Sequence, residues 1–256
     1  MIVSPHNPKI QAARDLLLHA KARREAQAFV VEGVRLVEEA QQAGWKMRQV
    51  LWSSDLSPRG RALVERCSAL RLAVDEVSPA VLNAISDTQT PQGLLAIVEM
   101  KPPPALPAPD FWLILDALRD PGNLGTILRT ASAAGVQAAL LSSGCTDPYA
   151  PKVARAAMGA HFHLPIYSMD WPQIAAATRR AQVYLADAGG DLPYYRADLR
   201  APLALLIGGE AEGAGREAQA LPVRRLSIPM PGRAESLNAA AAASILIFEV
   251  VKQRSV

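Results

Sequence analysis

The sequence has only two cysteines, Cys67 and Cys145, among 256 residues. They are too few and too far apart for a disulfide framework or a cysteine-rich zinc site, so we expect both to be reduced and structural. His161 and His163 alternate along a strand-like segment, but no third ligand follows at a suitable spacing. We therefore predict no metal centre.

Long hydrophobic runs are also missing. No apolar stretch approaches the roughly 20 residues that a membrane-spanning helix needs. The opening stretch, MIVSPHNPKIQAARD, has no apolar core after a basic segment, so we expect neither a signal peptide nor a membrane anchor. These absences predict a soluble cytoplasmic protein without a membrane partner.

Neither of the two glycine-rich stretches carries a nucleotide-binding motif. Residues 118–135, LRDPGNLGTILRTASAAG, lack the lysine and the glycine spacing of a phosphate-binding loop. Residues 203–215, LALLIGGEAEGAG, do not match GxGxxG before a helix. A nicotinamide-dependent oxidoreductase on a doubly wound sheet is the weakest of the functions considered, and failure to bind NAD would dispose of it.

The basic residues are unevenly distributed. Net charge is only +3, which permits a nucleic-acid partner without requiring one. Between positions 9 and 24, on a stretch with helical periodicity, a single acidic residue accompanies five basic ones: Lys9, Arg14, Lys21, Arg23 and Arg24. This pattern indicates a candidate phosphate-facing helix, although a solvated helix face is the commoner explanation of such a run of charges.

Prolines mark a domain boundary. The stretch 101–109, KPPPALPAP, has five prolines in nine residues and favours an extended linker. We predict a smaller α/β domain over residues 1–100, whose opening helix is capped by Asn7 before Pro8, and a larger domain over residues 110–256. The smaller domain has strand-like runs near Phe29, Val50, Leu72 and Leu95.

The larger domain alternates apolar strands with helices. Its expected strands are FWLILDAL, QAALLSS, HFHLPIY, VYLADA, LALLIGGE and RLSIPM, with a last helix from about Ser236 to Lys252. Strands this apolar indicate a parallel sheet covered by helices. Ligands in such sheets bind at the carboxyl ends of the strands.

Three stretches place polar residues at those ends. After the first strand, a helix from about Gly122 offers free N–H groups to an anion, and Arg129 lies one turn beyond Gly125; a helix cap with a surface arginine is the alternative. Glu210 follows another strand, where its carboxylate is suited to hydrogen bonding with a ligand's hydroxyls or amine; a tight glycine-rich connection is the alternative. Ser236 is expected to cap the last helix, with Asn238 just inside it, where capping would not explain an asparagine.

Taken together, these stretches resemble a known family. The segments PGNLGTILRTA, LIGGEAEG and SIPMPGRAESLN, in this order, are similar to the three signature motifs of the SpoU (TrmH) family of RNA ribose 2′-O-methyltransferases, within the SPOUT superfamily. The first motif departs from the family pattern by beginning with Arg119-Asp120. NPKIQAARDLL and FVVEGVRLVEEA are similar to the ribosomal-protein-like RNA-binding domain that precedes many of these enzymes.

The resemblance implies a fold, a reaction and a site. It implies a deep C-terminal trefoil knot, a homodimer whose active sites combine both subunits, and S-adenosylmethionine as cofactor. By this resemblance the cofactor contacts Gly208, Gly209, Ile228, Met230 and Leu237. The catalytic residue is Arg129, supported by Asn123, with Glu210, Ser236 and Asn238 shaping the pocket.

The implied reaction is methylation of a ribose 2′-hydroxyl in structured RNA, with 23S ribosomal RNA as the expected target and transfer RNA as an alternative. The smaller domain would choose the RNA through the basic residues of positions 9–24. A catalytically silent ribosome-assembly factor with the same fold is the rival hypothesis. The role of Arg129 is also open, since a guanidinium stays protonated in most environments and serves better to position a phosphate and stabilise an alkoxide than as a base.

Overall fold

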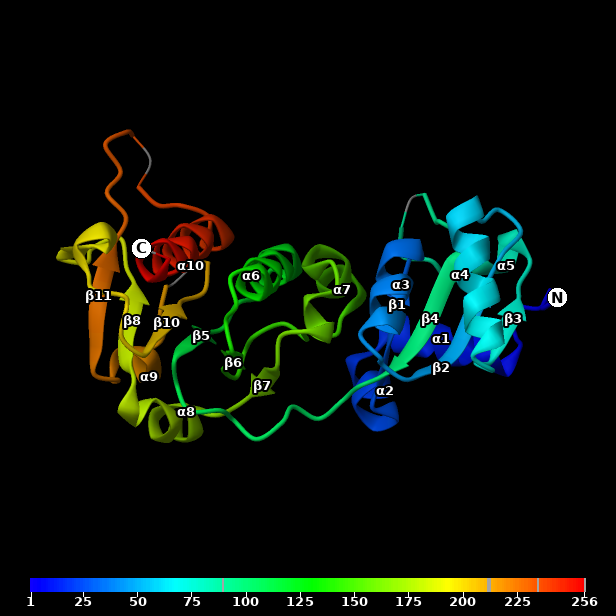
Figure 1. Cartoon of the computed structure of the whole chain (residues 1–256), viewed down its shortest axis with the longest axis horizontal. Coiled ribbons are helices and arrows are strands. Elements are labelled where there is room, and N and C mark those ends of the chain that lie inside the picture. The colour runs from blue at the N-terminus through cyan, green and yellow to red at the C-terminus, as the bar shows by residue number, and fades with distance from the viewer. Residues whose placement is uncertain (89, 211–212, 234, 256) are drawn as a thin grey trace. The chain divides into compact units, whose positions relative to one another are not determined.

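The computed structural model describes residues 1–88, 90–210, 213–233 and 235–255 (Figure 1). Contacts divide the chain into two compact units. The first comprises Met1–Pro102 with Tyr149–Phe162, and the second comprises Pro103–Pro148 with His163–Val256. The first break falls inside the proline-rich stretch, whereas nothing in the sequence indicates that residues 149–162 group with the N-terminal residues.

The first unit is built on a mixed sheet with the strand order β1-β4-β2-β3. Its strands are β1 (Ala28–Glu32), β2 (Met47–Trp52), β3 (Val74–Glu76) and β4 (Leu94–Glu99). Its helices are α1 (Pro8–Leu18), α2 (Ala20–Ala26), α3 (Val34–Gln42), α4 (Pro58–Ala69), α5 (Pro79–Ile85) and α7 (Pro151–Ala157). β4 pairs antiparallel with β1 and with β2, and β2 pairs parallel with β3.

Alternation along β1 shows why helices cover both faces of this sheet. Phe29 and Val31 belong to one buried cluster, with side chains from α3 and α4. Ala28 and Val30 belong to another, with side chains from α1 and α5. Successive residues of a strand point to opposite faces, so a strand that is apolar throughout needs a layer on each side.

The second unit carries a seven-stranded sheet in which every pairing is parallel, in the order β7-β6-β5-β10-β8-β11-β9. The strands are β5 (Phe111–Leu115), β6 (Ala138–Leu141), β7 (Ile166–Ser168), β8 (Gln182–Ala186), β9 (Leu192–Pro193), β10 (Leu203–Ile207) and β11 (Val223–Ser227). The helices are α6 (Pro121–Ala133), α8 (Trp171–Ala177), α9 (Arg216–Gln219) and α10 (Ala239–Arg254). The prediction of a parallel sheet is confirmed, and the central strands β5 and β10 are buried throughout.

Several local predictions are confirmed and others are wrong. Asn7 caps α1 as expected, through a hydrogen bond that its side chain accepts from the N–H of Lys9. HFHLPIY is not one strand. His161 lies in a short 3-10 helix over Ala160–Phe162, buried beside the rings of Phe29 and Tyr149, and β7 begins only at Ile166.

The basic stretch from position 9 to 24 is two helices rather than one. The chain leaves the helical conformation at His19, which separates α1 from α2. Arg23 is 4% exposed and donates hydrogen bonds from Nη1 to the carbonyls of Leu16 and Leu17. Its guanidinium satisfies the carbonyl end of α1, which does not favour the predicted RNA contact of Arg23.

Candidate active site

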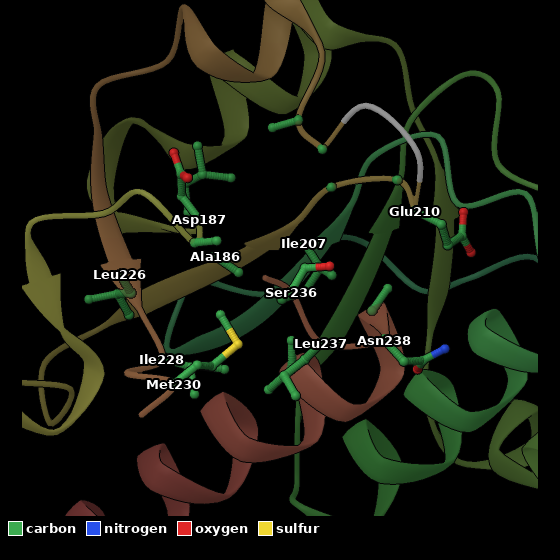
Figure 2. A pocket seen from close by; sticks show the side chains of 18 of the residues that line it. Ala186, Asp187, Ile207, Glu210, Leu226, Ile228, Met230, Ser236, Leu237 and Asn238 are labelled. Carbon is green, nitrogen blue, oxygen red and sulfur yellow. The ribbon is translucent and has the colours of Figure 1, made fainter. Parts of the chain in front are cut away.

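A cavity of about 580 Å³ opens in the second unit at the carboxyl ends of β8, β10 and β11 (Figure 2). One part of its lining is apolar and follows these strands: Leu185, Ile207, Leu226, Ile228 and Met230. Another part is polar: Asp187, Glu210, Gln219, Ser236 and Asn238. Apolar walls with a few convergent polar groups are typical of a site for a small organic ligand, and the volume suits a drug-sized molecule.

All five residues predicted to contact a cofactor line this cavity: Gly208, Gly209, Ile228, Met230 and Leu237. Ile228, Met230 and Leu237 come from the irregular segment between β11 and α10, as Figure 2 shows. This segment and the glycine loop after β10 are far apart in the sequence. Folding brings them together because β8 alone separates β10 from β11.

In the glycine loop after β10, the backbone at Gly208 lies too close to that of Gly213 and Ala214 to leave room for a side chain. A Cβ added at Gly208 would overlap with the backbone of Gly213 and Ala214. Gly209 and Gly213 exchange backbone hydrogen bonds of 3.0 and 3.2 Å, which closes the loop. Glycine is therefore required at position 208 for this close approach, which shapes the cavity wall.

Three polar residues from the three motifs meet beside the cavity. The Nδ2 of Asn123, on α6, donates to Oε1 of Glu210 at 3.0 Å. The Nδ2 of Asn238 donates to Oδ1 of Asn123 at 2.8 Å. Glu210 and Asn238 also line the cavity, so one continuous hydrogen-bonded chain links α6, the glycine loop and the start of α10.

Glu210 follows β10, and its carboxylate accepts hydrogen bonds from backbone N–H groups of its own chain, whereas the sequence suggested a ligand's hydroxyls or amine as its donors. Its donors are the N–H groups of Arg119 and Asp120, at 3.3 Å each. Partial burial raises the pKa of Glu210, but the hydrogen bonds from Asn123 and from the backbone outweigh burial and leave the pKa below its ordinary value. Glu210 is therefore a structural carboxylate that stays ionised at neutral pH.

Asn238, not Ser236, caps the last helix, which corrects the prediction for both residues. α10 begins at Ala239, and Asn238 has non-helical backbone angles. Its Oδ1 accepts from the N–H of Ala240 at 2.9 Å and of Ala241 at 3.2 Å. The sequence pattern places the start of this helix too early. It puts Asn238 inside the helix, whereas Asn238 caps α10 with Oδ1 and still donates from Nδ2 to Asn123. Ser236 lines the cavity outside the helix.

Neither Asn123 nor Arg129 lines the cavity, but Asn123 is hydrogen-bonded to two residues that do, whereas Arg129 is not. Arg129 lies on α6 with an exposed side chain and is not among the lining residues. Within the part of the chain that the structure describes, its side chain has no hydrogen bond or ion pair. Gly125, one turn before Arg129, is a buried residue of α6.

Asp187 lines the cavity and also stabilises a local turn, in which the N–H of Gly189 donates to Oδ1 of Asp187 at 2.9 Å. Its other oxygen accepts from Arg225 at 2.8 Å. Asp187 closely follows β8. No local pattern in the sequence shows that β8 lies beside β10, and this strand order is what places Asp187 at the cavity.

Metal ligation and membrane insertion find no support in the described residues. No group of three or more histidine, cysteine, aspartate or glutamate side chains there could hold a metal ion. No described helix is both long enough and apolar enough to cross a bilayer.

Comparison with known proteins identifies the class. Residues 110–248 match the SpoU rRNA methylase family, and residues 7–96 match the MRM3-like substrate-binding domain. The chain belongs to the SpoU rRNA methylase family.

Its relatives match along nearly the whole chain. The 23S rRNA (guanosine(2553)-2′-O)-methyltransferase RlmP of Bacillus subtilis is 33% identical over 97% of this chain and 98% of its own length. The 23S rRNA (uridine(2479)-2′-O)-methyltransferase of Streptomyces viridochromogenes is 32% identical, with coverage of 98% and 92%. The AdoMet-bound rRNA methyltransferase of Sinorhizobium meliloti superposes with a TM-score of 0.86 at 33% identity, covering 98% of this chain and 97% of that one.

Proposed function

We propose that this chain transfers a methyl group from S-adenosylmethionine to a ribose 2′-hydroxyl of 23S ribosomal RNA. The observation that carries the proposal is the hydrogen-bonded chain Asn238–Asn123–Glu210 at the cavity, in which each motif of the family domain supplies one residue. The names of relatives add support, since two are 23S rRNA 2′-O-methyltransferases and one was solved with AdoMet bound.

The cavity fits this cofactor. Its apolar wall suits a flat heteroaromatic base, and the close approach of Gly208 to Gly213 leaves backbone groups as the surface of the glycine loop. The residues proposed to hold the cofactor are Gly208, Gly209, Ile228, Met230 and Leu237. When bound, S-adenosylmethionine supplies a methyl group on a positively charged sulfur.

The chain's own task in the reaction is to position the RNA hydroxyl. Arg129 is proposed to bind the phosphate next to the target ribose and to stabilise the alkoxide that develops as the hydroxyl loses its proton. A guanidinium remains protonated and is suited to this role. Asn123, Glu210, Ser236 and Asn238 shape the surface against which the ribose lies.

We infer that the enzyme works as a homodimer, with Arg129 acting in the partner's site. Support comes from the exposed position of Arg129 on α6, away from the cavity of its own chain. α6 packs on α10, where the hydroxyls of Thr130 and Ser244 lie 3.3 Å apart. α10 leaves Phe248 49% exposed, an apolar side chain that a second copy would cover.

RNA recognition is proposed for the first unit. Arg14 and Arg24 are exposed and have no acidic partner among the residues that the structure describes. Lys9 and Lys21 are paired, with Asp75 and with Glu25 respectively. An unpaired arginine is free to bind a phosphate, so Arg14 and Arg24 are the stronger candidates of the four.

A deep trefoil knot and a cytoplasmic location complete the proposal. The strand order supports the knot, because the chain leaves β10 near the centre of the sheet, adds β11 beside β8, and returns through α10 to contact β10 and α6. The location follows from the proposed ribosomal substrate.

Labelled methyl transfer tests the function. Total RNA from cells that lack the protein is incubated with the protein and labelled S-adenosylmethionine, and alkali-resistant ribose positions are then mapped. Label at one 23S site supports the proposal, and label in transfer RNA would show that transfer RNA is the substrate instead. Cofactor binding with no methyl transfer to any RNA would favour the hypothesis of a catalytically silent ribosome-assembly factor over that of an enzyme.

A further inference from the structure

Asp116 is a buried carboxylate that none of the roles described above uses. It lies just after β5, is 3% exposed, and donates its backbone N–H to the carbonyl of Ile207 at 2.9 Å. Among the described residues no lysine or arginine pairs with it. An unpaired carboxylate is costly to bury unless hydrogen bonds compensate, so its contacts indicate what it contributes.

Both carboxylate oxygens hold backbone that borders the active site. Oδ2 accepts from the N–H of Gly215 at 2.7 Å, at the end of the glycine loop. Oδ1 accepts from the hydroxyl of Ser142 at 2.8 Å, and the Ser142 oxygen accepts from the N–H of Ala117 at 3.2 Å. Asp116 thus ties the turn after β5 to the loop after β10.

The two tied segments lie against each other under tight constraints. Ala117 has a φ of +51°, a left-handed conformation that a non-glycine residue adopts only when its surroundings hold it there. A Cβ at Gly209 would lie 3.0 Å from the Ala117 carbonyl oxygen. Beyond these contacts the same two segments carry Arg119, Asp120 and Glu210, which are hydrogen-bonded across the gap.

We propose that Asp116 is a positioning residue for the cofactor site: it holds Gly215 in place, and with it the described residues 208–210 and 213–214 of the glycine loop, so that Gly208, Gly209, Gly213 and Ala214 form the wall of the cavity. It acts through hydrogen bonds and not through its charge. This inference rests on the proposed binding of S-adenosylmethionine in that cavity, but it is tested by binding and does not require RNA methylation.

Two variants separate hydrogen bonding from charge. Asp116→Asn removes the charge but keeps the shape, with its oxygen accepting from Gly215 and its amide donating to Ser142. Asp116→Ala removes both links and leaves the Gly215 N–H without its acceptor. Each variant is titrated calorimetrically with S-adenosylmethionine and with S-adenosylhomocysteine, which lacks the methyl group and the positive sulfur.

The expected result is that Asp116→Ala lowers the affinity for both ligands equally, by about tenfold, which is equivalent to about 1.4 kcal/mol. Asp116→Asn is expected to stay within about threefold of the wild type for both. Hydrogen exchange should accelerate over residues 208–219 in the alanine variant only. At saturating RNA, the KM for the cofactor should rise more than kcat falls.

Two results would overturn the proposal. If Asp116→Asn loses as much affinity as Asp116→Ala, and only for the positively charged ligand, the carboxylate attracts the cofactor by charge. If Asp116→Ala binds both ligands like the wild type, the loop does not need the link. Should Asp116→Ala fail to fold, Ser142→Ala is the second variant, because it keeps the Gly215 link but frees the carboxylate at its other end. It is expected to weaken the binding of both ligands by about threefold. Wild-type affinity of Ser142→Ala for both ligands would also reject the proposal.

Discussion

Asn238 and Asn123 are 115 positions apart in the chain, yet the amide of one donates to the amide oxygen of the other at 2.8 Å. The same Asn238 side chain caps α10. One residue therefore stabilises a helix and joins two motifs, and these contributions can be separated by substitution.

Asn238→Ser should keep the cap and lose the bond to Asn123, because a serine hydroxyl can accept from the first turn but cannot reach across. Asn238→Ala should lose both, and destabilise the protein by about 1 kcal/mol. We expect thermal unfolding to be nearly normal for the serine variant while methyl transfer falls in both. Full activity of the serine variant would show that the bond to Asn123 is dispensable.

Gly208→Ala should deform the cavity, since its Cβ would overlap with the backbone of Gly213 and Ala214. Gly232→Ala is the matched control, because its Cβ would meet no atom within 4 Å. We expect a loss of about 1–3 kcal/mol in stability for the first variant, with cofactor affinity reduced at least about tenfold, and little change in the second. Calorimetric titration and denaturant unfolding measure both; equal behaviour of the two variants would contradict the cavity model.

Arg129→Ala should abolish methyl transfer and leave cofactor binding intact, because its side chain does not line the cavity of its own chain. Loss of cofactor binding as well would mean a structural role.

Mixed dimers test whether Arg129 acts across subunits. Arg129→Ala and Asn238→Ala chains are co-expressed with different tags and the mixed species is purified. If Arg129 serves the partner's site, each mixed dimer has one intact site and about half the wild-type activity. If it serves its own chain, both sites are broken and the mixed dimer is inactive.

Replacing Arg14 and Arg24 together by alanine should weaken RNA binding and flatten its salt dependence, by roughly one unit of slope for each phosphate that the protein no longer binds. Arg200→Ala is the control, since Arg200 is exposed but paired with Asp198 in the other unit. Affinity is measured by filter binding at several salt concentrations. An unchanged slope in the double variant would place the RNA-binding surface elsewhere.

Acid should weaken the Glu210 network. The pKa of Glu210 is lower in the folded protein than its ordinary 4.5, so the unfolded chain binds a proton more readily. Its contribution to stability is complete above pH of about 4.5 and is lost as pH falls through the folded value. The difference in unfolding free energy between the wild type and Glu210→Gln should be constant near neutrality and shrink below that pH. A difference that does not change with pH would contradict this.

The sequence was most informative where one residue type has one structural use. Uninterrupted apolar strands such as FWLIL and LALLI are stable only when buried on both faces, and they predicted the parallel sheet correctly. The order of the three motifs was also sufficient for the family, which the comparisons confirm. Asn7 before Pro8 predicted the first helix for the same reason.

The sequence was least informative where a side chain had more than one use. Arg23 could bind RNA or donate to the free carbonyl groups at the end of α1, and only the packing of the folded chain places it against those carbonyls. The sequence pattern puts Asn238 inside a helix, because no local signal shows that one side chain both caps α10 and bonds Asn123. His161 fitted an alternating strand pattern, but the chain turns there into a short 3-10 helix.

The sequence alone determined the class of sheet and the family, because the first follows from a local pattern of polarity and the second from the order of three short motifs. The tertiary structure decided which segments meet. The strand order brings the ends of β8, β10 and β11 to one cavity, and it places Asp116 against Gly215 and Asn238 against Asn123. These pairs join residues 99 and 115 positions apart, and no local pattern of residues encodes them.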